Sequence, residues 1–197
     1  RTDARLNDPA LDRPCWWFSL AAIGHVHEWA MWSLVRGDFI DPDGEAFTRS
    51  FVLSPGAVGV VALRDGAQPR VVLVRQYRPA LHRMTLEIPA GMRDVEGEDP
   101  LITAERELRE EVGIEADHWQ RLGKHTSAPG ISNSSVEVFL ARQLRDVDHD
   151  RHGPEERHMT IEEFTLQEAL AMVADGRIDD AKTVIGLLLT DRVLRGG

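Results

Sequence analysis

The first half of the chain carries alternating and β-branched runs of apolar residues that predict β-strands. The segment Asp41–Gly44 is a strong turn signal between two of them. Arg64–Ala67 separates two β-branched runs, which indicates a hairpin of buried strands. The predicted strands, including two near the C-terminal end, are His25–Phe39, Ala46–Leu53, Ala57–Leu63, Arg70–Val74, Thr85–Ile88, Val136–Ala141 and Met159–Leu166.

The clearest helix signal follows Asp99, a good N-cap residue, with Pro100 at the first helical position. Apolar residues then recur at helical spacing along one face, and Gly113 closes the helix. These apolar residues are Leu101, Ala104, Leu108 and Val112. Two more helices are predicted at Gln167–Ala174 and Ala181–Leu194. Strands and helices interleave without a regular βαβ rhythm, so the pattern predicts an α+β fold with helices on both faces of a mixed sheet.

Composition and charge narrow the class of protein. A chain of 197 residues with 42% hydrophobic and 28% charged residues suits one ordinary domain with a small N-terminal extension. The net charge of −10 argues against a nucleic-acid polymer or an anionic membrane as partner, because both need clustered Lys and Arg. An acidic protein can still act on a small anion when bound cations bridge the two.

The N-terminal region predicts neither a leader nor a membrane span. Residues 1–14 are polar, and the apolar stretch Cys15–Val35 is interrupted by His25, His27 and Glu28. Cys15 is the only cysteine, so neither an intramolecular disulfide nor a thiolate zinc cluster can form. We therefore expect a reducing compartment, which means a cytoplasmic location.

The predicted helix after Asp99 has an acidic face. Glu107, Glu110 and Glu111 are spaced i, i+3 and i+4, so their carboxylates share one side, away from the apolar stripe. Like charges at these spacings destabilise a helix by about 0.2–0.5 kcal/mol per pair. A hard cation such as Mg²⁺, which prefers oxygen ligands, would remove that penalty. Taken alone, the three glutamates fit a solvated acidic face at least as well.

The residues around these glutamates resemble the Nudix box. The run Arg106–Ile114 (Arg-Glu-Leu-Arg-Glu-Glu-Val-Gly-Ile) matches the fixed positions of its core, and Glu98 stands at the family spacing before Arg106. Gly91 also matches, but six residues separate it from Glu98 where the family pattern has five. The loop 92–97 is therefore one residue longer.

Segments outside the box resemble the ADP-ribose pyrophosphatase branch of the family, over a stretch from about Phe39 to Leu194. These segments are Gln76–Pro79, Leu86–Gly91, Ser127–Gly130 and Gly153–Glu156 followed by His158–Met159. The resemblance implies a Nudix α/β/α sandwich over residues 54–197. It also implies a small antiparallel N-terminal region over residues 1–53 that contributes to a homodimer and to substrate contacts.

Carried over residue by residue, the resemblance implies roles for particular side chains. Glu107, Glu110 and Glu111, with the carbonyl oxygen of Ala90, would bind Mg²⁺ or Mn²⁺. The substrate would meet Arg78, whose guanidinium suits phosphate oxygens, together with Pro129. Arg49 is placed by its strand to reach a phosphate, although a solvated strand arginine is as good an interpretation. Glu155 or Glu156, together with Glu111, would activate the attacking water. Arg157 and His158 stand where the branch often has acidic residues, so either glutamate remains a candidate.

The resulting hypothesis is metal-dependent hydrolysis of ADP-ribose to AMP and ribose 5-phosphate. Alternatives are another nucleotide sugar or dinucleotide, a nucleoside triphosphate, or binding of ADP-ribose without cleavage. The tryptophans of the N-terminal region are expected to pack in a core or a subunit interface, where Trp is common, or to stack on an adenine ring. These tryptophans are Trp16, Trp17, Trp29 and Trp32.

Overall fold

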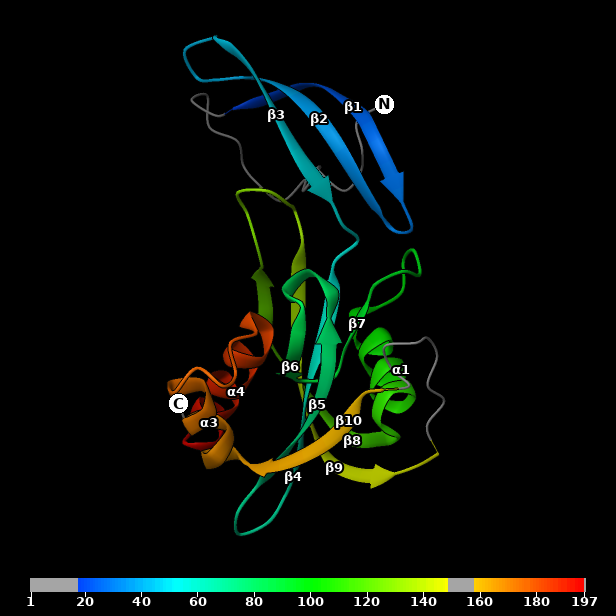
Figure 1. The fold of residues 1–197 in the computed structure, drawn as a ribbon, viewed down its shortest axis with the longest axis vertical. Coiled ribbons are helices and arrows are strands. Elements are labelled where there is room, and N and C mark those ends of the chain that lie inside the picture. The colour runs from blue at the N-terminus through cyan, green and yellow to red at the C-terminus, as the bar shows by residue number, and fades with distance from the viewer. Residues whose placement is uncertain (1–17, 149–157, 197) are drawn as a thin grey trace. The chain divides into compact units, whose positions relative to one another are not determined.

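The computed structural model describes residues 18–148 and 158–196 (Figure 1). The chain forms two compact units. One comprises the residues up to Gly56 together with Thr126–Ser135, and the other comprises Ala57–His125 with the residues from Val136 onward. Within the described residues, no helix is long and apolar enough to cross a membrane.

The first unit contains a three-stranded antiparallel sheet in the order β1-β2-β3. Its strands are β1 (Ser19–Trp29), β2 (Trp32–Ile40) and β3 (Ala46–Leu53). The prediction of one strand over His25–Phe39 is wrong, because the chain turns between β1 and β2. This turn uses Ala30 with a φ of 46°, and no Gly, Pro, Asn or Asp marks it in the sequence.

A segment distant in sequence completes this unit. The backbone N–H of Val52 in β3 donates to the carbonyl of Ile131 at 2.8 Å, and the N–H of Ser54 donates to Oδ1 of Asn133 at 2.8 Å. The hydroxyl of Ser132 donates to the carbonyl of Val52 at 2.9 Å. Residues 131–133 are therefore bound to the end of β3 through an isolated β-bridge between Val52 and Ser132.

The second unit is built on a seven-stranded mixed sheet. Its main path is β10-β5-β4-β9-β8, with β6 paired to β5 and β7 paired to β4. Strands β4 and β9 run parallel, whereas β4–β5, β5–β10, β5–β6 and β4–β7 are antiparallel. The strands are β4 (Ala57–Arg64), β5 (Arg70–Arg78), β6 (Arg83–Glu87), β7 (Ala90–Met92), β8 (Ile114–Thr126), β9 (Ser135–Asp146) and β10 (Thr160–Thr165). A 3₁₀ turn, η2 (Pro79–Leu81), links β5 to β6.

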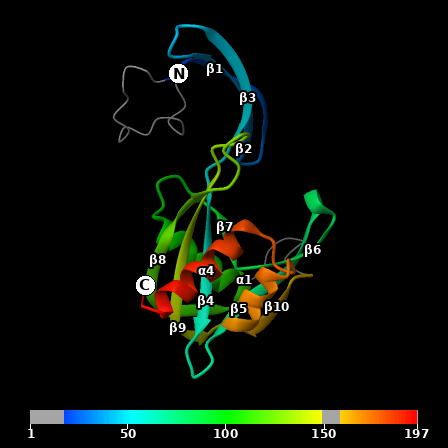
Figure 2. The same ribbon diagram turned by 90° about the vertical axis from the view of Figure 1, so that its left-hand side faces the viewer.

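Helices cover both faces of this sheet, as Figures 1 and 2 show. The α-helices among the described residues are α1 (Pro100–Val112), α3 (Leu166–Ala174) and α4 (Ala181–Leu194). Because side chains alternate along β4, Val60 packs with Leu108 of α1, while Val61 packs with Leu187 of α4. The predicted α+β class, with a mixed sheet between helices, is confirmed.

A buried ion cluster ties β5 and β6 to the start of α4. Glu87 is 2% exposed. It accepts hydrogen bonds from the guanidinium of Arg78, from the hydroxyl of Thr85 and from the ammonium group of Lys182. Burial alone would raise the pKa of Glu87, but the two cations outweigh it and hold the pKa at about 2. The carboxylate therefore stays charged at neutral pH.

This cluster predicts how stability depends on pH. The folded-state pKa of Glu87 is depressed, so its contribution is present above the unfolded value of 4.5 and is lost as the pH falls toward about 2. Glu87→Gln should lower the free energy of unfolding by roughly 3 kcal/mol at pH 7. Urea unfolding of both proteins between pH 7 and pH 2.5 would show this gap closing below pH 4.5. A gap that stays constant with pH would contradict the assignment.

Candidate functional site

Helix α1 orients the acidic face. The carboxylate of Asp99 accepts from the N–H of Leu101 at 2.8 Å and caps the first turn, while Gly113 ends the helix in the left-handed conformation with a φ of 66°. The apolar stripe around Leu108 faces the sheet. Glu107 and Glu111 therefore lie beside that stripe, with side chains that are mostly buried at its edge.

Glu107 fills a space that only a glycine leaves open. A Cβ atom built on Gly91 in β7 would lie 1.9 Å from the carboxyl carbon of Glu107. The carboxylate thus packs directly against the backbone of β7. Burial, aided by the charges of Glu110 and Asp94, raises the pKa of Glu107 to about 7, although Arg106 opposes this shift. A negative charge at this position is therefore costly even with Arg106 beside it, and a bound metal ion would offset that cost.

Glu111 joins α1 to the same strand. Its Oε2 atom accepts from the N–H of Ala90 at 3.0 Å, and the side chain is 7% exposed. Ala90 is held in turn by pairing of β7 with β4, opposite Gly59. The structure therefore brings together three of the residues that the sequence assigned to metal binding, Ala90, Glu107 and Glu111.

The arrangement fits a cation that takes part of its shell from water and substrate. Across residues 18–148 and 158–196, no three His, Cys, Asp or Glu side chains stand together as a ready-made metal cage. Mg²⁺ does not require such a cage, because it is commonly held by one or two carboxylates plus waters and phosphate oxygens. The buried carboxylate of Glu107, with its raised pKa, and the nearby backbone oxygen of Ala90 supply donors of the kind that Mg²⁺ prefers.

Arg106 organises the remaining acidic groups around the start of this face. Its Nη1 atom donates to Glu107 at 2.8 Å and to Glu110 at 3.4 Å. Its Nη2 atom lies 3.3 Å from Asp94 and 3.7 Å from Glu98. The arginine of the box thus partly neutralises four carboxylates and holds them in place.

Arg78 lies at the end of β5 and is already engaged. Its Nε and Nη2 atoms donate to the two oxygens of Glu87 at 2.8 and 2.6 Å. Neither Glu87 nor Lys182 was predicted from the sequence to have a role. The sequence contains one signal for Glu87, because a charged residue between Leu86 and Ile88 in an otherwise apolar strand indicates a buried carboxylate with a partner. No comparable signal marked Lys182, which lies far away in the sequence.

Two other predicted site residues, Arg49 and Pro129, belong to the first unit. Arg49, on β3 of the first unit, donates from Nη1 to the carbonyl of Thr48, and its guanidinium lies 5.1 Å from the ring centre of Phe47. Pro129 is exposed in a turn of the same unit. Glu155 and Glu156 lie outside the described residues.

Of the four N-terminal tryptophans, the structure describes Trp29 and Trp32. Trp29 is 41% exposed, and its ring lies 5.5 Å from that of His27 and 6.4 Å from that of Trp32, measured between ring centres. Trp16 and Trp17 fall outside the described residues.

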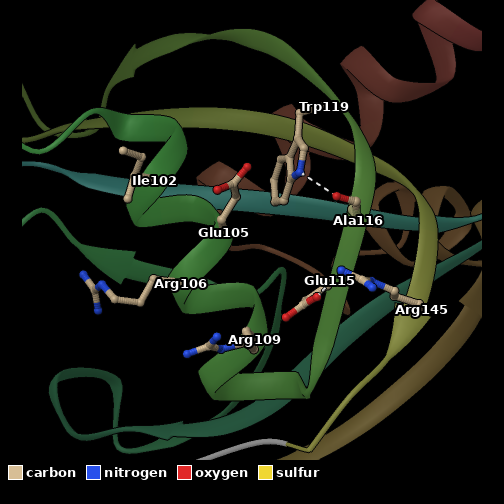
Figure 3. Close-up of a pocket in the computed structure, with 8 residues that line it drawn as sticks. All are labelled: Ile102, Glu105, Arg106, Arg109, Glu115, Ala116, Trp119 and Arg145. Atoms are coloured by element: carbon tan, nitrogen blue, oxygen red, sulfur yellow. Dashed lines mark hydrogen bonds and ion pairs between the residues drawn. The ribbon is translucent and has the colours of Figure 1, made fainter.

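A separate hollow of about 480 Å³ lies between α1 and β8 (Figure 3). The indole of Trp119 extends into it and donates to the carbonyl of Ala116 at 3.1 Å. Its lining residues are Ile102, Glu105, Arg106, Arg109, Glu115, Ala116, Trp119 and Arg145. Neither Glu107 nor Glu111 lines this hollow, so it is distinct from the carboxylate cluster against β7.

The chain is similar to known proteins in both sequence and fold. A family model described as NUDIX domain matches residues 53–185. An ADP-ribose pyrophosphatase of Mycobacterium tuberculosis is 40% identical over 171 residues, which cover 87% of this chain and 82% of that protein. An ADP-ribose pyrophosphatase of Bacillus subtilis is 37% identical over 146 residues, 74% of this chain and 77% of that protein.

A solved structure described as an ADP compounds hydrolase has the same fold. It matches with a TM-score of 0.77 and 21% identity, covering 91% of this chain and 95% of that one. Together with the match to the family model and the relatives above, the carboxylate face of α1 seated against β7 identifies this chain as a member of the Nudix hydrolase family.

Proposed function

We propose that this chain hydrolyses the diphosphate bond of ADP-ribose to give AMP and ribose 5-phosphate, with Mg²⁺ or Mn²⁺ as cofactor. The observation that carries the proposal is the packing of Glu107 and Glu111 against the backbone of Ala90 and Gly91. The substrate class is supported by the relatives named ADP-ribose pyrophosphatases, which match over most of their own length.

In this proposal Glu107, Glu110 and Glu111 hold the metal with the carbonyl oxygen of Ala90. The bound cation supplies neutralisation of the diphosphate charge and polarisation of the phosphorus under attack. Glu107 must lose its proton to act as a ligand, and its pKa of about 7 allows this near neutral pH. The hydrogen bond from the N–H of Ala90 holds the carboxylate of Glu111 in a fixed orientation.

The other assignments complete the proposed mechanism. Arg78 binds a phosphate oxygen through its free edge, and Arg49 and Pro129 contact the substrate. Glu155 or Glu156 acts with Glu111 to orient and deprotonate the attacking water. An unperturbed glutamate is a weak base at neutral pH, so deprotonation of the water by this glutamate would depend on the acidity that a bound cation would supply.

We also propose a cytoplasmic homodimer. The location is supported by the single cysteine, which suits a reducing compartment, and cell fractionation would test it. The dimer is supported by the sheet of the first unit, whose strand β1 has no buried residue and leaves several large apolar side chains exposed. Exposed apolar patches of this kind mark interaction surfaces. A second copy of the chain is the proposed partner for the exposed side chains of Phe18, Val26, Trp29 and Ile40.

A substrate panel tests the reaction. With Mg²⁺ present, ADP-ribose should be cleaved with a kcat/KM at least about tenfold above those of ADP-glucose, GDP-mannose, NADH, diadenosine polyphosphates and dGTP. Chromatography of the products should show AMP and ribose 5-phosphate in equal amounts. A higher kcat/KM for another compound would identify that compound as the substrate in place of ADP-ribose. Tight binding of ADP-ribose without cleavage would indicate a sensor and refute the proposed hydrolysis.

Gly91→Ala tests the packing of the Glu107 carboxylate against the backbone of β7. The new methyl group would occupy the space of the carboxylate, so turnover should fall about a hundredfold, as it should for the ligand variant Glu111→Gln. The free energy of unfolding should change by less than about 1 kcal/mol, because only the flexible end of Glu107 must move. Gly24→Ala is the matched control, since nothing lies within 4 Å of that position. Normal turnover in Gly91→Ala would contradict the metal-site assignment.

Val26→Glu tests the dimer. The wild-type chain should sediment at twice the mass of one chain, and a charge on β1 should weaken self-association about tenfold or more. Val95→Glu is the control, because Val95 is similarly exposed, at 51% against 59% for Val26, but belongs to the second unit. A monomeric wild type, or equal effects of the two variants, would refute this interface.

A further inference from the structure

The Glu87 carboxylate uses both of its oxygens twice. Oε1 accepts from Nε of Arg78 at 2.8 Å and from the hydroxyl of Thr85 at 2.6 Å. Oε2 accepts from Nη2 of Arg78 at 2.6 Å and from the ammonium group of Lys182. A carboxylate that is 2% exposed and accepts four hydrogen bonds has a fixed position and plane.

This arrangement in turn fixes the guanidinium of Arg78. Its Nε–H and one Nη2–H are held in a two-point contact with Glu87, whereas Nη1 has no hydrogen-bond partner among the described residues. The Arg78 side chain is 42% exposed, although that of its partner is 2% exposed. One edge of the guanidinium is therefore anchored to the protein, and the other edge remains accessible.

Arg78 lies on the side of β5 that packs against α1. Alternation along β5 puts Arg78 on the same face as Val72 and Val74, which pack with Leu108 of α1. The hydrogen bonds with Glu87 are the main cause of the raised pKa of Arg78, and the charges of Asp180 and then of Glu111 contribute smaller parts.

The start of helix α4 also contacts Glu87, through Lys182. Asp180 caps this helix, and its Oδ2 atom accepts from the N–H of Thr183 at 3.0 Å. The same oxygen accepts from Lys182 at 3.0 Å, so the ammonium group bridges Asp180 and Glu87. The start of α4 therefore supports the carboxylate that supports Arg78.

We propose that Glu87 and Lys182 are positioning residues, which set the guanidinium of Arg78 so that its Nη1 edge meets a phosphate oxygen of the substrate. This proposal rests on the proposed function, because it names how one phosphate contact of that reaction is prepared. Pre-orienting the arginine reduces the conformational freedom that substrate binding would otherwise have to remove.

A double-mutant cycle on kcat/KM for ADP-ribose tests the proposal. Glu87→Gln should lower kcat/KM about tenfold and Lys182→Met about threefold, mainly through KM. In the Arg78→Met background, Glu87→Gln should have no further effect beyond about twofold, because the arginine that it positions is gone. Lys182→Met keeps the Arg78–Glu87 pair and serves as the second variant if Glu87→Gln does not fold.

Glu162→Gln is the matched control. Glu162 also makes a two-point contact with an arginine of β5, Arg75, at 2.5 and 3.0 Å, but alternation puts Arg75 on the opposite face from Arg78. Its kcat/KM should stay within about twofold of the wild type. Full additivity of Glu87→Gln and Arg78→Met, or an equal loss in Glu162→Gln, would overturn the positioning role.

An NMR measurement separates this proposal from the choice of substrate. The Nε–H signal of Arg78, assigned by its loss in Arg78→Met, should be sharp in the wild type and broadened or shifted in Glu87→Gln. An unchanged signal in Glu87→Gln would overturn the proposal without any assay of activity. A chain that cleaves no ADP-ribose but shows this NMR change would refute the proposed substrate and leave the positioning of Arg78 standing.

Discussion

The packing of α1 against the sheet determines where the chemistry of this protein lies. Leu108 and its apolar neighbours bury one side of the helix on β4 and β5, and this fixes the rotation of the helix about its own axis. Glu107 and Glu111 flank the buried stripe, so the same rotation directs them toward β7. The glycine at position 91 allows the close approach. If the helix were rotated by one residue about its axis, less apolar area would be buried on the sheet. The same rotation would also move the carboxylates away from Ala90.

Local signals in the sequence were sufficient for the elements that carry this arrangement. Asp99, Pro100 and Gly113 marked both ends of α1, and the apolar spacing marked its buried face. The β-branched runs marked β4 and β5, although β5 continues to Arg78 and β9 to Asp146, beyond the predicted ends. The resemblance to the box put Gly91 and Glu107 in one motif, but the contact between them became evident only in the structure.

Interactions between distant residues were harder to predict. Lys182 donates to Glu87 although 95 positions of sequence separate them, and no local pattern around either residue predicts this contact. Strand β8 was missed, because charged and polar residues between Ile114 and Thr126 interrupt the apolar alternation and Ile114 is the only buried residue of the strand. The turn at Ala30 was missed because its left-handed backbone uses a residue that rarely adopts it.

The attachment of residues 126–135 to β3 has a consequence for the order of events during synthesis. Domains tend to fold from the N-terminus as the chain leaves the ribosome. Here the edge of β3 gains its partner only after Ile131 and Asn133 have been made, about 80 residues later. Until then the backbone groups of Val52 and Ser54 are open to pairing with other strands. The N-terminal sheet is therefore translated before the second unit, yet the edge at β3 is completed only after residues 57–125 of that unit have been made.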